Sequence, residues 1–211
     1  MKPVVCWDFD ETLGYFRPLE FKFLGIEPPF AMPPVRLKPG IRELLESLSE
    51  FTHVVTTAAM ELYAREVLHG QGLLDCFADV IGRESGLFRA DGKDYKVVGD
   101  RLGIAESELA RRLVIVGNDS ERDPDLRYRG IVMVFDEALV DHPSEPLGVV
   151  LRRLVREGGG EVRAGFDRLL EAARSHSADG VKFELDFWGT FADDRIHPMV
   201  VRPRATASKL S

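Results

Sequence analysis

The feature that most constrains the fold is an alternation of short apolar runs with amphipathic segments along the first two thirds of the chain. Between the apolar runs, hydrophobic residues recur at the three- and four-residue spacing of a helix. Apolar strands separated by helices predict a parallel sheet covered on both faces, which is a doubly wound α/β fold. The runs lie at 4–7, 52–57, 80–81, 113–116 and 131–135, and the predicted helices at 41–48, 60–69, 96–102 and 107–112.

The remaining segments predict a flap, a hairpin and a C-terminal extension. The segment 15–39 is rich in aromatic residues and proline, so we expect an ordered flap there and not a helix. The segment 86–95 has an Asp-Gly pair between short arms, which predicts a hairpin. We expect a core domain over 1–140 and an extension of the same domain over 141–211. The extension contains predicted helices near 147–157 and 161–175 and apolar stretches at 181–188 and 198–201.

Composition narrows the classes of function. The formal net charge is −7, which argues against nucleic acid or a membrane surface as the main partner, because both attract a basic protein. No eighteen consecutive residues are apolar, and the first strand begins too close to Met1 for a signal peptide to precede it. The two cysteines, Cys6 and Cys76, form neither a disulfide framework nor a metal-binding spacing. We therefore expect a cytoplasmic protein with no membrane partner.

Two carboxylates follow the first apolar run with one residue between them. Side chains alternate faces along a strand, so Asp8 and Asp10 point the same way while Phe9 points the other way. Two like charges held side by side are unfavourable unless a cation, a proton or a chemical task compensates them. The pair is therefore a candidate for metal binding and acid-base chemistry, and the alternative is a solvated acidic turn.

Polar residues also stand near the ends of later strands in an order that suits phosphoryl transfer. That reaction needs a nucleophile, a cation to offset oxygen charge, and fixed hydrogen-bond donors around the phosphoryl group. In a doubly wound sheet these residues meet at the carboxyl edge of the strands. They are Thr57 at the end of the second run, Lys96 after the predicted hairpin, and Asn118 with Asp119 after the run 113–116.

The ordered set resembles the four motifs of the haloacid dehalogenase (HAD) superfamily over residues 1 to about 140. Those motifs are an Asp-x-Asp-x-Thr strand end, a Thr or Ser strand end, a Lys and an acidic strand end. A narrower similarity points to phosphatases acting on the C-terminal domain of RNA polymerase II and their relatives, the NLI-interacting factor-like branch. It rests on the strings Asp8-Phe9-Asp10-Glu11-Thr12-Leu13, Thr57-Ala58-Ala59 and Asn118-Asp119-Ser120.

The resemblance implies a role for each matching residue. Asp8 would be the nucleophile that forms an aspartyl-phosphate, and Asp10 would act first as acid and then as base. Thr57 and Lys96 would also be catalytic: Thr57 would donate a hydrogen bond to a phosphate oxygen, and Lys96 would hold its positive charge against Asp8 and the phosphoryl group. Thr57, Ala58 and Lys96 would bind the phosphoryl group. Mg²⁺ would be the cofactor, since it prefers oxygen ligands and can bridge a carboxylate and a phosphate. Its expected ligands are Asp8, the main-chain carbonyl of Asp10, and Asp119, with Asp123 as the alternative to Asp119.

The resemblance leaves the substrate open. Cap insertions largely select substrates in this superfamily, and the segments 14–38 and 58–95 are too short for a large cap. An open site suits a bulky partner such as a phosphorylated protein segment, which would itself exclude water. If the extension or a second subunit covers the site, a small phosphorylated metabolite or nucleotide is equally plausible. A non-catalytic module that binds phosphorylated partners is the alternative from another class.

Overall fold

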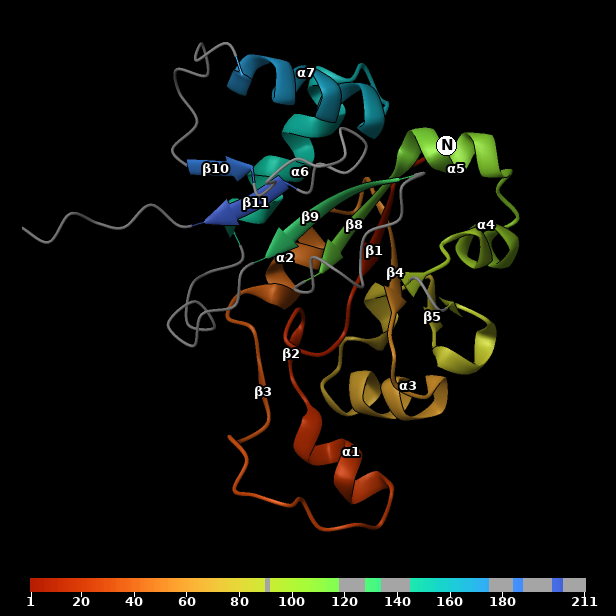
Figure 1. The fold of residues 1–211 in the computed structure, drawn as a ribbon, viewed down its shortest axis with the longest axis vertical. Coiled ribbons are helices and arrows are strands. Elements are labelled where there is room, and N and C mark those ends of the chain that lie inside the picture. Colours follow the sequence, from red (N-terminus) through yellow and green to blue (C-terminus); the bar gives the residue numbers. More distant parts are fainter. Residues whose placement is uncertain (90–91, 118–127, 134–144, 175–183, 188–198, 203–211) are drawn as a thin grey trace, which may run out of the picture.

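We describe the protein from a computed structural model. The structure describes residues 1–89, 92–117, 128–133, 145–174, 184–187 and 199–202, and all statements below concern these residues (Figure 1). Within them, no helix has both the length and the hydropathy needed to cross a membrane.

The architecture is a seven-stranded sheet in which β1 is flanked on both sides by parallel strands (Figure 1). The chain builds outward from β1 to β4 and β5, then returns to the opposite side of β1 for β8, β9 and β11. Among the described strands of this sheet, only β10 runs antiparallel to its neighbour. The predicted doubly wound α/β fold is confirmed. The strands are β1 Val4–Trp7, β4 Thr52–Thr56, β5 Asp79–Ile81, β8 Leu113–Gly117, β9 Arg129–Met133, β10 Glu184–Phe187 and β11 Met199–Arg202.

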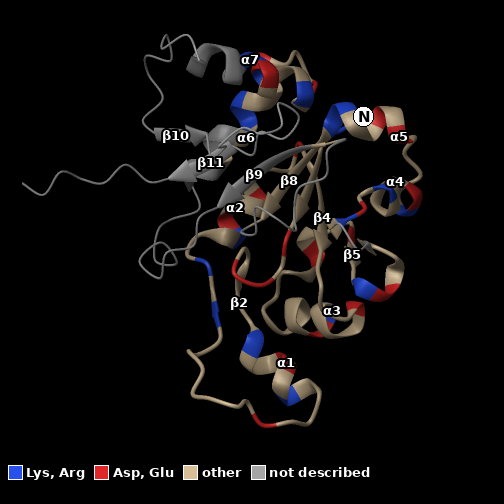
Figure 2. Ribbon diagram, viewed as in Figure 1, with Lys and Arg blue, Asp and Glu red and all other residues tan. Residues whose placement is uncertain are grey.

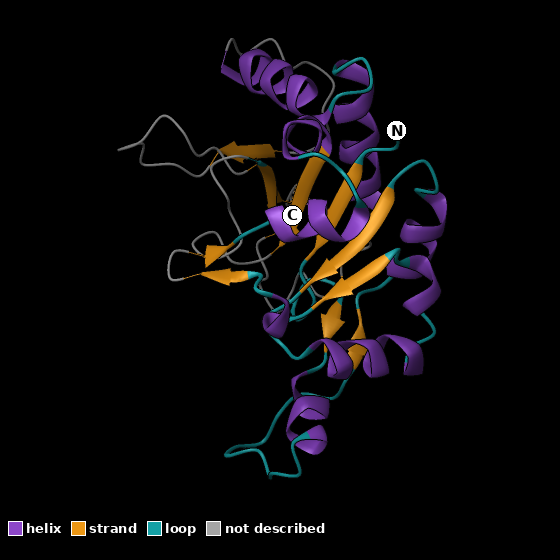
Figure 3. Cartoon of the chain, turned by 90° about the vertical axis from the view of Figure 1, so that its right-hand side faces the viewer, coloured by secondary structure: helices purple, strands orange, loops and turns teal. Residues whose placement is uncertain are grey.

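Helices pack on both faces of the sheet (Figure 3). Successive side chains of a strand point to opposite faces, and all four residues of β1 are buried, so both faces need to be covered. Val5 and Trp7 of β1 belong to one apolar cluster with α2 Ile41–Ser47, α3 Glu61–Gly70, α6 Glu145–Glu157 and α7 Val162–Arg174. Val4 and Cys6 belong to another with α4 Lys96–Leu102 and α5 Glu106–Arg112. Two short 3₁₀ turns, η1 Leu74–Cys76 and η2 Arg83–Ser85, flank β5.

The segment between β2 Gly14–Tyr15 and β3 Arg36–Leu37 corrects one prediction. It was expected to be non-helical because of its prolines, but it contains the helix α1 Arg17–Phe23. Pro18 lies in the first turn of that helix, where a missing backbone N–H costs nothing. Both views show α1 and the loop after it extending away from the sheet (Figures 1 and 3). We call residues 17–35 the insert.

The predicted hairpin is present as β6 Phe88–Arg89 paired antiparallel with β7 Gly92–Lys93. Helices α6 and α7 lie where the sequence predicts them, and β10 and β11 continue the main sheet. Leu151 and Phe166 of these helices are fully buried in the same cluster as Trp7. Helices α6 and α7 therefore share the apolar cluster that contains Trp7 of the first strand.

Candidate active site

The loop after β1 carries both carboxylates out of the sheet edge, and Figure 2 shows it as the red segment between β1 and β2. The Asp8 N–H donates to the Val116 carbonyl of β8 at 2.8 Å, so Asp8 still follows the strand direction. The chain then turns tightly: the Leu13 N–H donates to the Phe9 carbonyl at 3.1 Å, and Glu11 adopts a left-handed φ of 62°. The turn fixes where the two carboxylates lie.

Asp10 lies in a half-buried position that favours its protonated form. Its Oδ1 accepts a hydrogen bond from the Phe16 N–H at 3.2 Å. Burial raises the pKa of Asp10 to about 7; the Phe16 hydrogen bond opposes this rise, while the charges of Asp8 and Glu20 add to it. A carboxyl group with a pKa near neutrality can both release and accept a proton under physiological conditions.

A lysine contacts the first carboxylate directly, and it is Lys93 of β7. Its Nζ lies 2.6 Å from Oδ1 of Asp8 and donates to the Thr56 carbonyl at 3.2 Å. The Lys93 side chain is 3% exposed and that of Asp8 is 15% exposed. A charge pair so well shielded from water interacts strongly, because the local dielectric constant is low.

This placement corrects the prediction that Lys96 would face Asp8. Lys96 is the first residue of α4, is exposed, and donates its backbone N–H to Asp94 Oδ1 at 3.1 Å. Lys96 lies at the surface, at the start of α4, whereas the hairpin directs the Lys93 side chain toward Asp8. Sequence reasoning missed Lys93 because two lysines stand close together and nothing in the local pattern distinguishes them.

Thr57 lies just past the end of β4, next to β1. The parallel register pairs Trp7 with Val55, so Thr57 follows at the same edge of the sheet as the carboxylates. It is buried, and its Oγ1 accepts a hydrogen bond from the Ala59 N–H at 3.0 Å. A hydroxyl that accepts in this way still has its own proton to donate. Ala58, the next residue, is exposed.

The predicted metal ligands are only partly within the described structure. Trp7 pairs with Val116 in β8, so Gly117, the last residue of β8, lies beside Asp8. Asp119 and Asp123 fall outside the described residues. Among the residues that the structure does describe, no group of three His, Cys, Asp or Glu side chains could hold a metal. The carboxylate oxygens of Asp8 and Asp10 are donors that fit a hard cation such as Mg²⁺.

Comparison with solved structures finds hydrolases of the HAD superfamily. A predicted phosphatase from Clostridium acetobutylicum is 15% identical, with 64% of this chain and 85% of the other covered at a TM-score of 0.46. A HAD hydrolase from Bacillus subtilis bound to magnesium is 14% identical, with 63% and 86% covered at a TM-score of 0.47. L-2-haloacid dehalogenase from Xanthobacter autotrophicus, with chloropropionic acid covalently bound, is 13% identical, with 74% and 83% covered at a TM-score of 0.47.

No protein-family model matches the sequence, and no curated protein matches it as a relative. The function proposed below therefore rests on this chain's own residues and on the geometry of the site.

Proposed function

We propose that the protein is a Mg²⁺-dependent phosphatase of the HAD type that hydrolyses phosphomonoesters through an aspartyl-phosphate at Asp8. The observation that carries the proposal is the shielded 2.6 Å contact between Lys93 Nζ and Asp8 Oδ1. One residue separates Asp8 in the sequence from Asp10, whose carboxyl group has a pKa of about 7. A nucleophile, a fixed cation and a proton donor thus occupy one strand end.

In the first step, a carboxylate oxygen of Asp8 attacks phosphorus, and the bond from phosphorus to the ester oxygen breaks. Asp10 gives its proton to the departing oxygen, so the alcohol leaves uncharged. In the second step, Asp10 takes a proton from water while that water attacks phosphorus, which releases phosphate and restores Asp8. A pKa near 7 suits Asp10 to both proton transfers.

Two further residues stabilise charge during these steps. Lys93 already touches Asp8 and is placed to neutralise the oxygens of the transferring phosphoryl group. The Thr57 hydroxyl is placed to donate a hydrogen bond to one of those oxygens. Asp8, the carbonyl of Asp10 and Asp119 would hold Mg²⁺, which would offset the repulsion between a carboxylate and a phosphate dianion.

We propose a bulky substrate such as a phosphorylated protein segment. The insert is too short to cover the site as a lid, and it presents exposed apolar side chains, an unusual arrangement unless they contact a partner. Those side chains are Phe23, Leu24, Ile26 and Phe30, with Leu62 of α3. A small phosphorylated metabolite or nucleotide is the competing substrate class. The similarity to phosphatases of the RNA polymerase II C-terminal domain remains an expectation from the sequence motifs.

The test is phosphate release by the purified full chain with Mg²⁺ from phosphopeptides, nucleotides and sugar phosphates assayed side by side. We expect release from phosphopeptides and no turnover by Asp8→Asn. That variant should still fold cooperatively, with a lowered thermal transition because the buried Lys93 loses its counter-charge. Release from small substrates alone would assign the competing substrate class. If no substrate is hydrolysed but beryllium fluoride with Mg²⁺ still binds, the protein is the non-catalytic alternative.

A further inference from the structure

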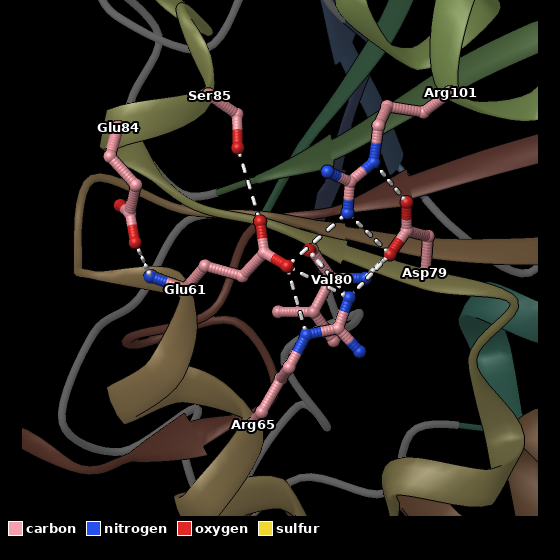
Figure 4. A network of polar contacts seen from close by, with 7 residues as sticks. All are labelled: Glu61, Arg65, Asp79, Val80, Glu84, Ser85 and Arg101. Atoms are coloured by element: carbon pink, nitrogen blue, oxygen red, sulfur yellow. Dashed lines mark hydrogen bonds and ion pairs between the residues drawn. The ribbon is translucent and has the colours of Figure 1, made fainter.

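A network of alternating charges connects α3, β5 and α4 (Figure 4). Arg65 donates to Oε1 of Glu61 at 3.0 Å and to Oδ1 of Asp79 at 2.5 Å. Arg101 reaches the same two carboxylates from α4, at 3.2 Å from Glu61 and 2.7 Å from Asp79. Each arginine therefore bridges two acids and each acid binds two arginines, a closed arrangement that exceeds what isolated surface pairs provide.

Glu61 also binds the segment before the hairpin. Its Oε2 accepts a hydrogen bond from Ser85 Oγ at 3.1 Å, and its own backbone N–H donates to Glu84 Oε1 at 2.8 Å. Burial alone would raise the pKa of Glu61, but the hydrogen bonds from Arg65 and Ser85 and the charge of Arg101 hold it below its ordinary value. Glu61 is thus an anion that binds Ser85 on one side and Arg101 on the other.

Those two sides lie before and after the hairpin that carries Lys93 in the chain. Ser85 precedes β6 in the chain, and Arg101 follows β7. A hairpin with two residues in each strand is not stable by itself. The residues on either side of it help to set its position: Leu87 and Tyr95 are fully buried in the core, and Glu61 of α3 binds Ser85 before the hairpin and Arg101 after it.

The same carboxylate lies near the other phosphate-binding residue in the chain. Glu61 is the first residue of α3, which begins four residues after Thr57. The network therefore ties the strand end with the hydroxyl to the hairpin with the lysine. Arg65 and Arg101 are about one third exposed, so they lie outside the site that they connect.

We propose that Glu61 and Arg101 are positioning residues that clamp the ends of segment 86–95 and so hold Lys93 against Asp8. The catalytic consequence rests on the proposed phosphatase function, whereas the structural consequence does not. A shift of the hairpin by about 1 Å would separate Lys93 from Asp8, and misplacements of that size can lower a rate by about 100-fold.

Acylation of lysine amines tests the clamp without any assay of activity. The full chain is treated with an acetylating reagent, and acetylation of Lys93 and Lys96 is followed by mass spectrometry. Lys96 is exposed and three residues away, so it serves as an internal reference. We expect Lys93 to react slowly in the parent protein and at least about fivefold faster in Arg101→Gln and Glu61→Gln, because local opening exposes it. Lys96 should not change.

Matched variants separate the clamp from general destabilisation. Arg111→Gln removes an exposed arginine that pairs with Glu161 at 3.1 Å outside the network, and it should leave Lys93 protected. Arg101→Lys should restore part of the protection. If Arg101→Gln does not fold, Ser85→Ala removes only the hydrogen bond from Ser85 Oγ to Glu61 and should still accelerate acetylation. Unchanged Lys93 reactivity in the folded Arg101, Glu61 and Ser85 variants would overturn the proposal.

A double-mutant cycle on kcat tests the catalytic consequence. Arg101→Gln should lower kcat by roughly tenfold or more in the parent protein. In a Lys93→Met background the same change should cost less than about twofold, because the residue that it positions is already gone. An equal loss in both backgrounds would show that Arg101 acts on the fold and not through Lys93. Faster acetylation in a protein without phosphatase activity would contradict the proposed function and leave the clamp intact.

Discussion

Lys93 and Lys96 differ in burial although they stand three residues apart. The 3% exposed side chain of Lys93 contacts Asp8, whereas Lys96 begins α4 at the surface. Removing a buried cation leaves its carboxylate partner without compensation, which costs far more than removing an exposed one. The two lysines therefore provide a matched comparison within one segment.

We predict that Lys93→Met lowers kcat by about 100-fold or more, the size of effect found for fixed charge-stabilising groups in active sites. Lys96→Met should stay within about twofold of the parent, because exposed charges contribute little. Steady-state kinetics on the same phosphopeptide measures both. Equal effects from the two substitutions would refute the assignment of Lys93.

His53 is a buried histidine whose hydrogen bonds fix its protonation state. Trp7 Nε1 can only donate, and it lies 3.1 Å from Nδ1 of His53, so Nδ1 carries no proton. The other nitrogen, Nε2, then carries the proton and donates to the Leu48 carbonyl at 3.1 Å. Burial is the main cause that lowers the pKa of His53 below its ordinary value. The residue is thus a neutral part of the core and not a catalytic base.

This histidine makes stability depend on pH. Below pH about 6.5 the unfolded chain binds a proton at His53 that the native chain does not bind, so the free energy of unfolding falls as pH falls. The contribution to the slope approaches about 1.4 kcal/mol per pH unit when only the unfolded state is protonated. Urea unfolding at pH 7, 6 and 5 should show a shallower pH dependence for His53→Gln than for the parent. Parallel curves would contradict the neutral state of His53.

At the scale of elements, the start of α3 depends on the close approach of the loop after β5. A Cβ at Gly82 would lie 2.3 Å from the backbone nitrogen of Glu61, and no flexible side chain could move to relieve the contact. Gly82 has a φ of −92°, so steric contact and not backbone conformation requires a glycine there. The glycine permits the approach that brings Glu84 to the Glu61 N–H.

We predict that Gly82→Ala lowers the free energy of unfolding by about 1–3 kcal/mol, the usual cost of overpacking. Gly70→Ala is the control, because a Cβ at the last residue of α3 meets nothing within 4 Å. That substitution should be neutral or stabilise by up to about 1 kcal/mol, since alanine favours helix more than glycine does. Urea titration of both variants gives the comparison, and a destabilisation of equal size would contradict the steric argument.

At the scale of the whole molecule, residues far apart in the described chain share one core. Phe166 of α7 is fully buried in the same cluster as Trp7 of β1 and Leu45 of α2. A cluster that joins distant segments favours unfolding as a single cooperative unit. We therefore expect helices α6 and α7 to stabilise the strand that leads into the candidate site.

We predict that Phe166→Ala lowers the free energy of unfolding by about 3–5 kcal/mol, as expected for a large buried aromatic side chain. The exposed Phe30 of the insert is the control, and Phe30→Ala should change stability by less than about 0.5 kcal/mol. Calorimetry should show one transition in every variant. A separate transition for residues 145–174 in the parent protein would contradict a shared core.

The sequence predicts the succession of strands and helices along the chain better than it predicts the details of their packing. The apolar runs and helical spacing predict β1, β4 and β8 with the helices between them, because burial on both faces of a sheet leaves a local signature. The start of α4 at Lys96 agrees with the predicted helix. Helix α1 is missed because proline is a helix breaker except in the first turn, and only the structure shows that Pro18 lies there.

The candidate site also contains residues that the sequence predicts and a residue that it does not predict. The location of Asp8, Asp10 and Thr57 at one edge of the sheet could be predicted from the sequence, because they follow recognisable strands whose ends meet at that edge. Lys93 could not be found, because a hairpin decides by its turn and register which lysine points inward. The pKa of Asp10 depends on its burial and on the hydrogen bond from the Phe16 N–H, and both come from the three-dimensional fold and not from the local sequence pattern.

The central claim is that Asp8 carries the phosphoryl group, and trapping the intermediate tests it most directly. A reaction with Mg²⁺ and a hydrolysed phosphopeptide is quenched in acid and reduced with borohydride, which converts an aspartyl-phosphate to homoserine. Mass spectrometry of the peptide that contains both Asp8 and Asp10 then locates the change. The account predicts homoserine at position 8, only in the presence of substrate. Homoserine at position 10, or no trapped product while turnover continues, would contradict it.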